Sequence, residues 1–540
     1  MKKKRMSFGS EAREKILRGA SALADAVRVT LGPMSKSVLI ERDWGQPLVC
    51  NDGVTIVKEF VLENQEENLG TQVLREAAER TSDSVGDGTT TSTLLAHAIF
   101  ADGVRNVVAG ASAVDIKRGL DRALAAAVRA LGALSRPVQS RLEKVQVATI
   151  SAHNDPGIGE MVADALERVG AEGVITVEEA KGTETEVEVV EGMQFDRGYL
   201  SPYFVTDAHK MEAVLEDPLI LLYDRKIVNM KDLLPLLEQV AKAGHPLVIV
   251  AESVEGDALA TLVVNRLRGT LASLAVKAPG FGERRRAHLE DMAVLVGGRA
   301  VCEELGTRLE ALGLEDLGKA KKVVADRETT TIIGGGGSKE AVEGRAQEIR
   351  AQIAKTTSDY DKEKLEERLA KLTGGVAVIR VGAPSETEMK SRKEAFDDAI
   401  SSTQAAVTEG IVPGGGLALL RAVAAVREEA ESCSGDERTG ALILARALEA
   451  PARQIAENSS VDGGVVVDRM KAGQGNFGFD AAKREYVDLF AAGIIDPTKV
   501  VRVALENAVS VASVLLLTEA TMVGVEEEEA GTRQPLEASF

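Results

Sequence analysis

The chain has 540 residues, of which 44% are hydrophobic and 28% charged, and it carries a formal net charge of −19. This length exceeds what one hydrophobic core can organise and predicts two to four domains, and the composition is that of a globular protein. The acidic balance excludes a nucleic-acid binder with a basic face, because no Lys/Arg block of the required size follows the short positive start at residues 2–5.

Neither the start of the chain nor its cysteines indicate export. Residues 6–13 are polar and charged and lack the apolar stretch of a signal peptide, so we expect a cytoplasmic protein. Cys50, Cys302 and Cys433 are isolated, which argues against a disulfide framework and a zinc site. The most apolar stretch, 508–517, is half a membrane span, and we expect a buried helix and no membrane contact.

The first part of the chain is predicted to be helices and loops. Apolar residues recur at helical spacing over 11–29, and the pattern breaks at Gly32 and Pro33. Further helices are predicted at 69–80 and 93–108.

The pattern changes near Val174 to short apolar strands that alternate with helices, which indicates a sheet covered by helices. The predicted strands are 174–177, 186–190, 219–222 and 247–250, and the predicted helices are 231–243 and 256–268.

Two charged amphipathic helices, 339–354 and 361–372, predict an αα-hairpin, and 375–381 returns to a strand. The chain is predicted to be helical again from Glu394. The order helical, mixed, helical predicts a discontinuous fold, in which both ends form one domain and the α/β segment is inserted.

The strongest chemical signal is the motif GDGTTT at 86–91, which leads into an apolar helix. The glycines let the backbone turn around an anion, and the helix start offers free N–H groups and the positive end of the helix dipole. The hydroxyls of Thr89, Thr90 and Thr91 add donors, and Asp87 is placed to hold Mg²⁺ against phosphates. A glycine turn that merely caps the helix is the alternative, and the three threonines favour phosphate binding.

Two other glycine-rich strings compete with this motif. Residues 473–478 match GxGxxG, the signature of a dinucleotide enzyme, but they follow a helix-like stretch where that signature needs a strand. Residues 334–337 lack the spacing of a Walker A loop, and we expect a flexible surface turn there.

Six motifs occur in an order that resembles the GroEL-type group I chaperonins, from about Phe8 to about Val523. They are TLGP at 30–33, NDG at 51–53, GDGTTT at 86–91, EGMQFDRGY at 191–199, KAPGFG at 277–282 and DPTK at 496–499.

This resemblance implies a multidomain chaperonin fold of the α+β and α/β classes. A mainly helical equatorial ATP-binding domain would comprise 1–134 and 411–525, and a small intermediate hinge domain 135–190 and 378–410. An α/β apical substrate-binding domain would comprise 191–377. Residues 526–540 would be a disordered acidic tail, where the family often has Gly-Gly-Met repeats.

The resemblance also assigns roles to single residues. Asp52 and Asp398 would orient the attacking water and Asp87 would bind Mg²⁺. Asp398 lies in the predicted hinge, so its movement into the site would couple hydrolysis to motion. The remaining nucleotide contacts would be Thr30, Leu31, Gly32, Pro33, Gly88, Thr89, Thr90, Thr91, Gly415, Asp480, Ala481, Ala482 and Asp496.

A polypeptide-binding groove is implied in the apical segment. Leu234 with Leu237, and Leu259 with Val263, have spacings that put each pair on one helix face. From the residues alone, packing on the sheet is the favoured alternative; the resemblance implies an exposed apolar patch. The groove residues would be Tyr199, Tyr203, Phe204, Leu234, Leu237, Leu259, Val263 and Val264. Arg197 and Glu386 match an ion pair between subunits.

Several positions depart from the family pattern. Met34-Ser35 stands where Lys-Gly is usual, and Asn51 replaces a lysine. Each missing positive charge near the polyphosphate is worth ~1 kcal/mol in a wet cleft. Asp480 replaces an asparagine, and Gln404 replaces an arginine in the hinge. These changes and the acidic tail suggest a specialised paralogue.

The function implied by the resemblance is an ATP-dependent folding machine, with ATP, Mg²⁺ and K⁺ as cofactors. It would form a seven-membered ring, single or in two stacked copies, that binds unfolded polypeptides and a lid-type co-chaperonin. The alternatives are a chaperonin-fold holdase or scaffold with weak or no ATP turnover, and a dinucleotide enzyme.

Overall fold

The computed structural model describes residues 4–41, 47–170, 173–180, 182–208, 210–302, 308–356 and 358–524. The chain forms two compact units: unit 1 is Met1–Val162 with Glu394–Phe540, and unit 2 is Ala163–Lys393. Both ends of the chain therefore belong to unit 1. The two boundaries fall inside the segments expected to form the hinge, and the division into three domains stays a prediction. The predicted acidic tail lies outside the described residues.

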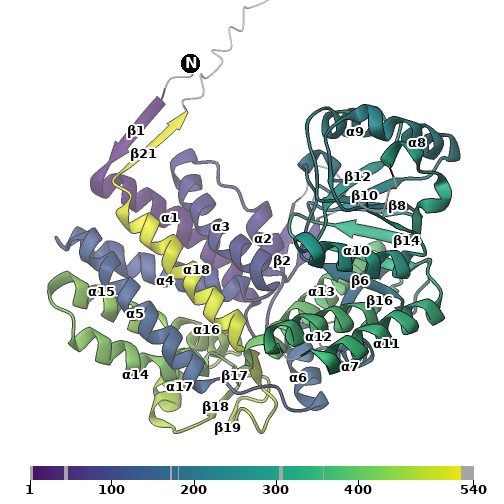
Figure 1. Ribbon diagram of the computed structural model, residues 1–540. Coiled ribbons are helices and arrows are strands. Elements are labelled where there is room, and N and C mark those ends of the chain that lie inside the picture. Colours follow the sequence, from purple (N-terminus) through teal and green to yellow (C-terminus); the bar gives the residue numbers. More distant parts are fainter. Residues whose placement is uncertain are drawn as a thin grey trace, which may run out of the picture. The chain divides into compact units, whose positions relative to one another are not determined.

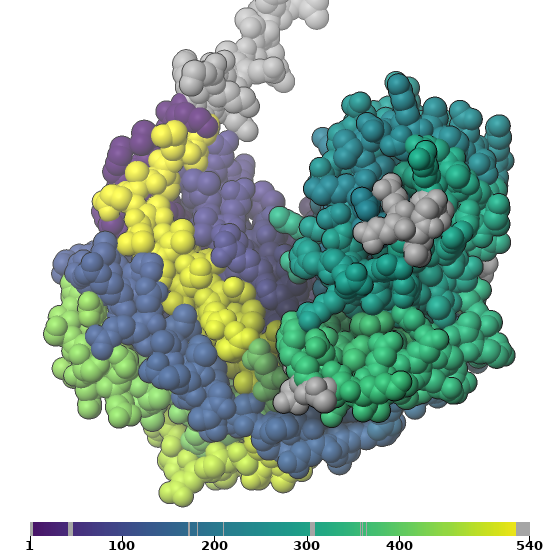
Figure 2. Space-filling model, in the orientation of Figure 1, coloured from purple at the N-terminus to yellow at the C-terminus, as the bar shows by residue number. Residues whose placement is uncertain are grey.

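Unit 1 is built mainly of helices around an aliphatic core. In the core α18 packs against α3, α4 and α5; it is the yellow helix of Figures 1 and 2. Within the described residues, α18 is also the one helix long and apolar enough to cross a membrane. Most of its side chains are buried among the other helices, which confirms the prediction of a buried helix at 508–517.

The helices predicted at 11–29, 69–80 and 93–108 are found as α1, α3 and α4, each with an earlier start, and α3 also ends later. The helices of unit 1 have the following bounds. They are α1 (Gly9–Val27), α2 (Gly53–Glu59), α3 (Gln65–Val85), α4 (Thr89–Val108), α5 (Ala113–Leu134), α6 (Arg141–Ser151), α14 (Leu417–Glu431), α15 (Gly435–Ala447), α16 (Ala450–Asn458), α17 (Gly463–Ala472) and α18 (Thr498–Leu517). The unit boundaries fall within α7 (Pro156–Val169) and α13 (Glu386–Glu409).

In the described part of unit 1, four small antiparallel ladders accompany the helices, and none of them was predicted from the sequence. β1 (Lys4–Phe8) pairs with β21 (Ala520–Gly524), so the first and last described strands lie side by side (Figure 1). The others pair β2 (Val38–Ile40) with β3 (Leu48–Cys50), β17 (Ile411–Pro413) with β20 (Ile495–Pro497), and β18 (Phe477–Asp480) with β19 (Glu485–Asp488). The GxGxxG string joins α17 to β18, so the absence of a preceding strand is confirmed.

Unit 2 contains, in its described residues, an eight-stranded mixed sheet whose parallel part is mostly apolar. The strands β8 (Leu219–Tyr223), β10 (Leu247–Ala251) and β12 (Ser273–Lys277) are parallel neighbours, linked by α8 (Met230–Ala243) and α9 (Gly256–Leu267). The chain then returns through α10 (Gly282–Val296) to β13 (Ala300–Val301) beside β8. Right-handed crossovers in opposite directions place α8 and α9 on one face and α10 on the other, as Figure 1 shows.

Antiparallel strands extend this sheet, and a smaller sheet packs against two of them, β14 (Gly318–Ala325) and β15 (Thr330–Gly335). The extension comprises β6 (Gly192–Phe195), β7 (Ala213–Glu216), β14 and β15. The smaller sheet has the order β4 (Val174–Glu179), β16 (Val376–Val381), β5 (Glu186–Val190). The predicted αα-hairpin is confirmed as α11 (Lys339–Lys355) and α12 (Asp359–Thr373), which pack together.

The flexible surface turn predicted at 334–337 is wrong. Gly334 and Gly335 are the last residues of β15. A Cβ atom at Gly335 would lie 2.3 Å from the carbonyl oxygen of Leu295, and one at Gly337 would lie 2.0 Å from that of Val294. The glycines are therefore needed for the end of this strand to pack against the backbone of α10.

Candidate functional site

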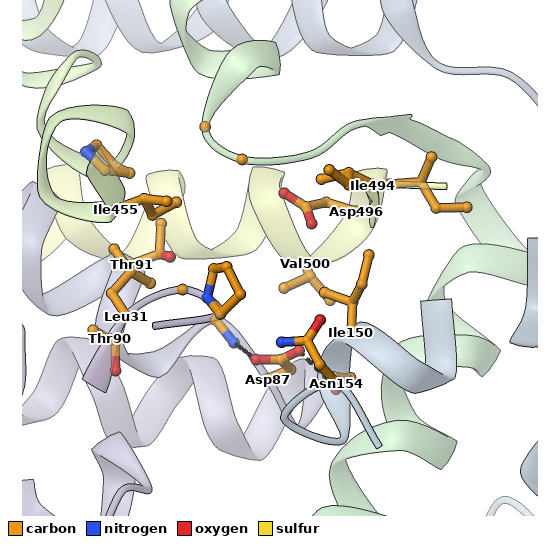
Figure 3. A pocket seen from close by; sticks show the side chains of 18 of the residues that line it. Leu31, Asp87, Thr90, Thr91, Ile150, Asn154, Ile455, Ile494, Asp496 and Val500 are labelled. Atoms are coloured by element: carbon orange, nitrogen blue, oxygen red, sulfur yellow. Dashed lines mark hydrogen bonds between the residues drawn. The ribbon is translucent and has the colours of Figure 1, made fainter. Parts of the chain in front are cut away.

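Unit 1 contains a cavity of about 530 Å³, and every residue predicted to act in catalysis or nucleotide binding lines it. The lining comes from the loop after α1, the start of α4, the loop before α14, the β18–β19 hairpin and β20. Figure 3 shows Asp87, Thr90, Asn154 and Asp496 around this space. Residues from both ends of the chain thus meet in one site.

The turn between α3 and α4 leaves a helix start open to the cavity. Gly86 and Gly88 have φ angles of 73° and 82°, which favour glycine, and they reverse the chain within three residues. Gly88 is the N-cap of α4, and no side chain caps this helix. Because the first N–H groups of a helix have no partner within it, the start of α4 is suited to bind an anion. The helix begins at Thr89, so the three threonines form its first turn.

One of the three threonine hydroxyls is directed away from an incoming phosphate. The Thr30 hydroxyl donates to the carbonyl oxygen of Val27 at 2.9 Å and lies 3.1 Å from the Thr90 hydroxyl. With Thr30 donating to Val27, Thr90 is the donor to Thr30. The Thr90 hydroxyl is therefore engaged within the protein in this arrangement, and its donation to a phosphate stays a prediction.

Asp52 and Asp398 line the cavity in different surroundings. Asp52 caps α2, accepting hydrogen bonds from the backbone N–H groups of Val54 at 3.3 Å and Thr55 at 2.7 Å. These bonds fix its carboxylate. The pKa of Asp398 is raised well above its usual value, first because burial disfavours the charge and then because Asp87 and Asp52 repel it.

Asp87 is held by three donors. Its carboxylate accepts from the backbone N–H of Gly88, from the Ser151 hydroxyl at 2.8 Å and from the Ser402 hydroxyl at 3.0 Å. Ser151 ends α6, and Ser402 lies on α13, one turn after Asp398. Asp87 is thus the point where α4, α6 and α13 meet.

The other end of the cavity carries two further aspartates. Burial raises the pKa of Asp496 to about 7, and the charge of Asp87 adds to the shift. Asp480 accepts hydrogen bonds from the backbone N–H groups of Ala482 at 3.0 Å and Lys483 at 3.2 Å, and the Lys483 ammonium lies 3.5 Å from it. Asp480 therefore fixes the turn that lines this end.

The cavity is strongly acidic. Five aspartates line it, whereas Lys483 is the one lysine or arginine among the described lining residues. No group of three or more His, Cys, Asp or Glu side chains in the described ranges is arranged to hold a metal ion alone. Mg²⁺ commonly takes one or two carboxylates together with phosphate oxygens and waters, so Asp87 fits a metal that arrives with a polyphosphate.

Sequence analysis missed several residues of the lining. Asn154 has a positive φ of 66°, which is unusual for a residue other than glycine, but one sequence does not reveal it. Lys483 directly follows the predicted Asp480–Ala482 contacts and could have been found by its charge. The apolar lining residues Ile150, Ile455 and Ile494 (Figure 3) carry no signal that separates them from core residues.

The family model of the TCP-1/cpn60 chaperonin family matches residues 23–525. The chain belongs to this chaperonin family. It is similar to Chaperonin GroEL 5 of Bradyrhizobium diazoefficiens, with 69% identity over 527 residues, which cover 98% of this chain and 97% of the relative. The predicted membership of the GroEL-type group I chaperonins is confirmed, and the protein is a chaperonin of mixed helix and sheet content.

The predicted polypeptide-binding residues of this chaperonin divide by exposure. Tyr203, Leu234 and Val264 are exposed, with 65%, 47% and 42% of their surfaces accessible. They lie on the 3-10 turn η2 (Pro202–Phe204), α8 and α9, and η2 and α8 each contact α9. The three therefore belong to neighbouring elements at the surface of unit 2.

The other predicted groove residues are less accessible. Phe204 and Leu237 are buried in the core of unit 2, so the prediction that they face outward is wrong. Leu237 belongs to the buried face of α8, together with Leu233 and Leu236, and the edge of that face runs between Leu234 and Leu237. The partly buried members of the groove are Tyr199, Leu259 and Val263.

The predicted ion pair between subunits has one member engaged within the chain. Glu386 pairs with Lys390 at 2.8 Å on α13. Its pairing with Arg197 of another subunit stays a prediction.

Proposed function

We propose that this chaperonin is an ATP-driven folding machine that hydrolyses ATP to ADP and phosphate. The observation that carries the proposal is the gathering of all predicted nucleotide residues around one cavity at the uncapped start of α4. Its volume of about 530 Å³ lies within the range of small-molecule sites, ~300–1,000 Å³.

The triphosphate would lie at the start of α4, and the base and ribose at the Asp480 and Asp496 end. The first N–H groups of α4 would bind phosphate oxygens. Asp87 would hold Mg²⁺, which supplies neutralisation of the phosphate charge in a cavity lined by five carboxylates. We also propose K⁺ as a second cation for the same reason.

Hydrolysis needs an aligned water, and two aspartates would provide the alignment. Asp52 is fixed by its two cap hydrogen bonds. Asp398 would accept a proton from the water, because burial and its acidic neighbours raise its pKa and so make its carboxylate a stronger base. The pair would thus orient the water and remove its proton.

The folding activity requires an assembly and a surface for clients. We propose a cytoplasmic ring of seven subunits, alone or in two stacked copies, that captures unfolded polypeptides and is closed by a lid-type co-chaperonin. Tyr203, Leu234 and Val264 would offer the exposed apolar contacts to clients.

The test is steady-state ATP hydrolysis by the purified oligomer with Mg²⁺ and K⁺. We expect Asp398→Ala to lower turnover by about 10²-fold or more, because a proton acceptor contributes 10²–10⁴-fold. Binding of ATP should change little. Asp397→Ala removes the neighbouring carboxylate, which is outside the cavity lining, and should retain turnover.

Absence of turnover by the unmodified oligomer would contradict the machine. With client binding retained, that result would favour a chaperonin-fold holdase or scaffold, which the acidic cavity and the missing lysine at Asn51 make the second candidate.

The client surface can be tested separately by Leu234→Glu. A charge among the exposed apolar residues Tyr203, Leu234 and Val264 should abolish most suppression of aggregation of a chemically denatured client, without loss of ATP turnover per subunit. Leu142→Glu is the matched control, because Leu142 is 63% exposed in unit 1. If both variants protect the client equally well, Leu234 is not part of the binding surface.

A further inference from the structure

The two serines that donate to Asp87 form a closed cluster with it. Ser151 and Ser402 approach the same oxygen, Oδ2, at 2.8 and 3.0 Å, and their hydroxyl oxygens are 2.9 Å apart. Two hydroxyls carry two hydrogens, so only two of these three contacts can be hydrogen bonds at one time. When both serines donate to Asp87, one carboxylate oxygen is fully committed to α6 and α13.

Ser402 has no alternative partner in water. Its residue is fully buried, with 0% of its surface accessible. A buried hydroxyl needs a protein partner, and within the described residues the hydrogen-bond partners of Ser402 are Asp87 and Ser151. The position of Ser402 is therefore tied to the position of the Asp87 carboxylate.

The helix that carries Ser402 also carries Asp398. The two residues are four apart in α13, so they lie on the same face. The adjacent Ser401 packs against the turn before α4: a Cβ atom at Gly86 would lie 2.4 Å from that of Ser401. α13 thus contacts the turn between α3 and α4 directly and also donates a hydrogen bond to Asp87.

We propose that Ser402, together with Ser151, is a positioning residue that orients Asp87 for the metal–nucleotide complex. Fixing Oδ2 from the protein side sets the direction in which the carboxylate presents its remaining lone pairs to the cavity. Asp398 lies on the same helix as Ser402. The contact of this helix with Asp87 therefore positions both the proposed metal ligand, Asp87, and the proposed proton acceptor, Asp398. This inference rests on the proposed nucleotide site.

The test measures metal affinity directly. Mn²⁺ is titrated into the full-length oligomer saturated with ADP, and free Mn²⁺ is followed by electron paramagnetic resonance. We expect Ser402→Ala to weaken Mn²⁺ binding about tenfold, as loss of a group that orients a metal ligand typically does. Ser402→Thr, which keeps the hydroxyl, should restore affinity to within about twofold of the parent.

Two controls separate positioning from structural damage. Ser401→Ala removes a neighbouring hydroxyl that makes no hydrogen bond to Asp87, and should leave Mn²⁺ affinity unchanged. ADP affinity measured in excess chelator should be the same in all variants. Ser151→Ala, at a partly exposed position, should weaken Mn²⁺ binding in the same direction and provides a second probe if Ser402→Ala folds poorly.

Unchanged Mn²⁺ affinity in both alanine variants, or no recovery in a folded Ser402→Thr, would overturn the role of the serines and leave the nucleotide site standing. An unmodified oligomer that binds no ADP would overturn the proposed function and this inference with it.

Discussion

Asp291 of unit 2 is buried and Asp496 of unit 1 is half-buried, and the surroundings of these two aspartates are opposite. In unit 2, Asp291 of α10 accepts hydrogen bonds from Arg345 at 2.7 Å and from Arg368 at 2.8 and 3.0 Å, which join α10 to α11 and α12. In unit 1, Asp496 faces the cavity, and no cation in the described ranges pairs with it.

The difference distinguishes charged side chains that are paired within the fold from charged side chains that are left available for a ligand. A buried carboxylate with two arginines around it is compensated within the protein. Asp496 is compensated only by a proton, since burial raises its pKa to about 7. The first arrangement stabilises the ligand-free chain and the second costs it stability.

The largest expected effect is from breaking the compensated cluster. Asp291→Asn leaves two arginines without their carboxylate, and removal of one member of a buried ion pair costs about 3–5 kcal/mol. Hydrogen exchange measured by mass spectrometry should show faster exchange across α10, α11 and α12. Asp361→Asn breaks an exposed pair with Arg284 in the same unit and should cost less than about 1 kcal/mol. Equal protection from hydrogen exchange in both variants would contradict the view that the buried cluster holds the fold more strongly than an exposed ion pair does.

Removal of the uncompensated charge should act in the opposite direction. The raised pKa of Asp496 means that the folded chain binds a proton more tightly than the unfolded chain, so the free energy of unfolding falls as pH rises from about 4 to about 7. Asp496→Asn cannot ionise and should make the ligand-free protein more stable at pH 8, by about 2 kcal/mol once water in the cavity is allowed for.

Chemical denaturation of the nucleotide-free protein at pH 8 and pH 4.5 checks this sign. The stabilisation by Asp496→Asn should shrink at the lower pH, where the unmodified Asp496 is protonated in the folded chain. A variant less stable than its parent at pH 8 would show that Asp496 is paired in solution.

The smallest expected effect comes from adding a cation to the acidic cavity. Asn51 lines the cavity, and Asn51→Lys should tighten ATP binding by about 1 kcal/mol, or roughly fivefold, by the Coulomb attraction of one charge in a wet cleft. The gain should decrease as salt rises from 50 to 500 mM. Asn51→Gln, of similar shape and no charge, should leave the affinity unchanged, and a matching gain there would exclude an electrostatic cause.

Local sequence patterns predicted well those helices and strands whose apolar residues recur at a regular spacing. The strand at 186–190 and the helix at 231–243 were placed within one residue of β5 and α8, because each has one dominant hydrophobic period. The helix predicted to start at residue 93 begins at Thr89, since polar residues in a first turn look like a preceding loop.

What depended on distant partners was not predictable from such patterns. β1 and β21 are at opposite ends of the chain, and neither strand is recognisable without the other. The resemblance gathered the right residues around the cavity but did not show that the Thr90 hydroxyl is turned to Thr30 or that Ser402 contacts Asp87. In α8, the spacing of Leu234 and Leu237 did not show that only the first is exposed, because the edge of the buried face depends on the neighbouring elements.

The insertion of unit 2 within unit 1 has a consequence for biosynthesis. The N-terminal helices of unit 1 leave the ribosome before Ala163–Lys393 is made, while their partner α18 is translated near the end. At typical rates of about 5–20 residues per second, the interval from Ala163 to the end of α18 is roughly 20–70 s. During this time the faces of α3, α4 and α5 that later cover α18 have no partner from their own core. A nascent chaperonin subunit is therefore itself an unfolded client with exposed aliphatic surface until its C-terminal helix arrives.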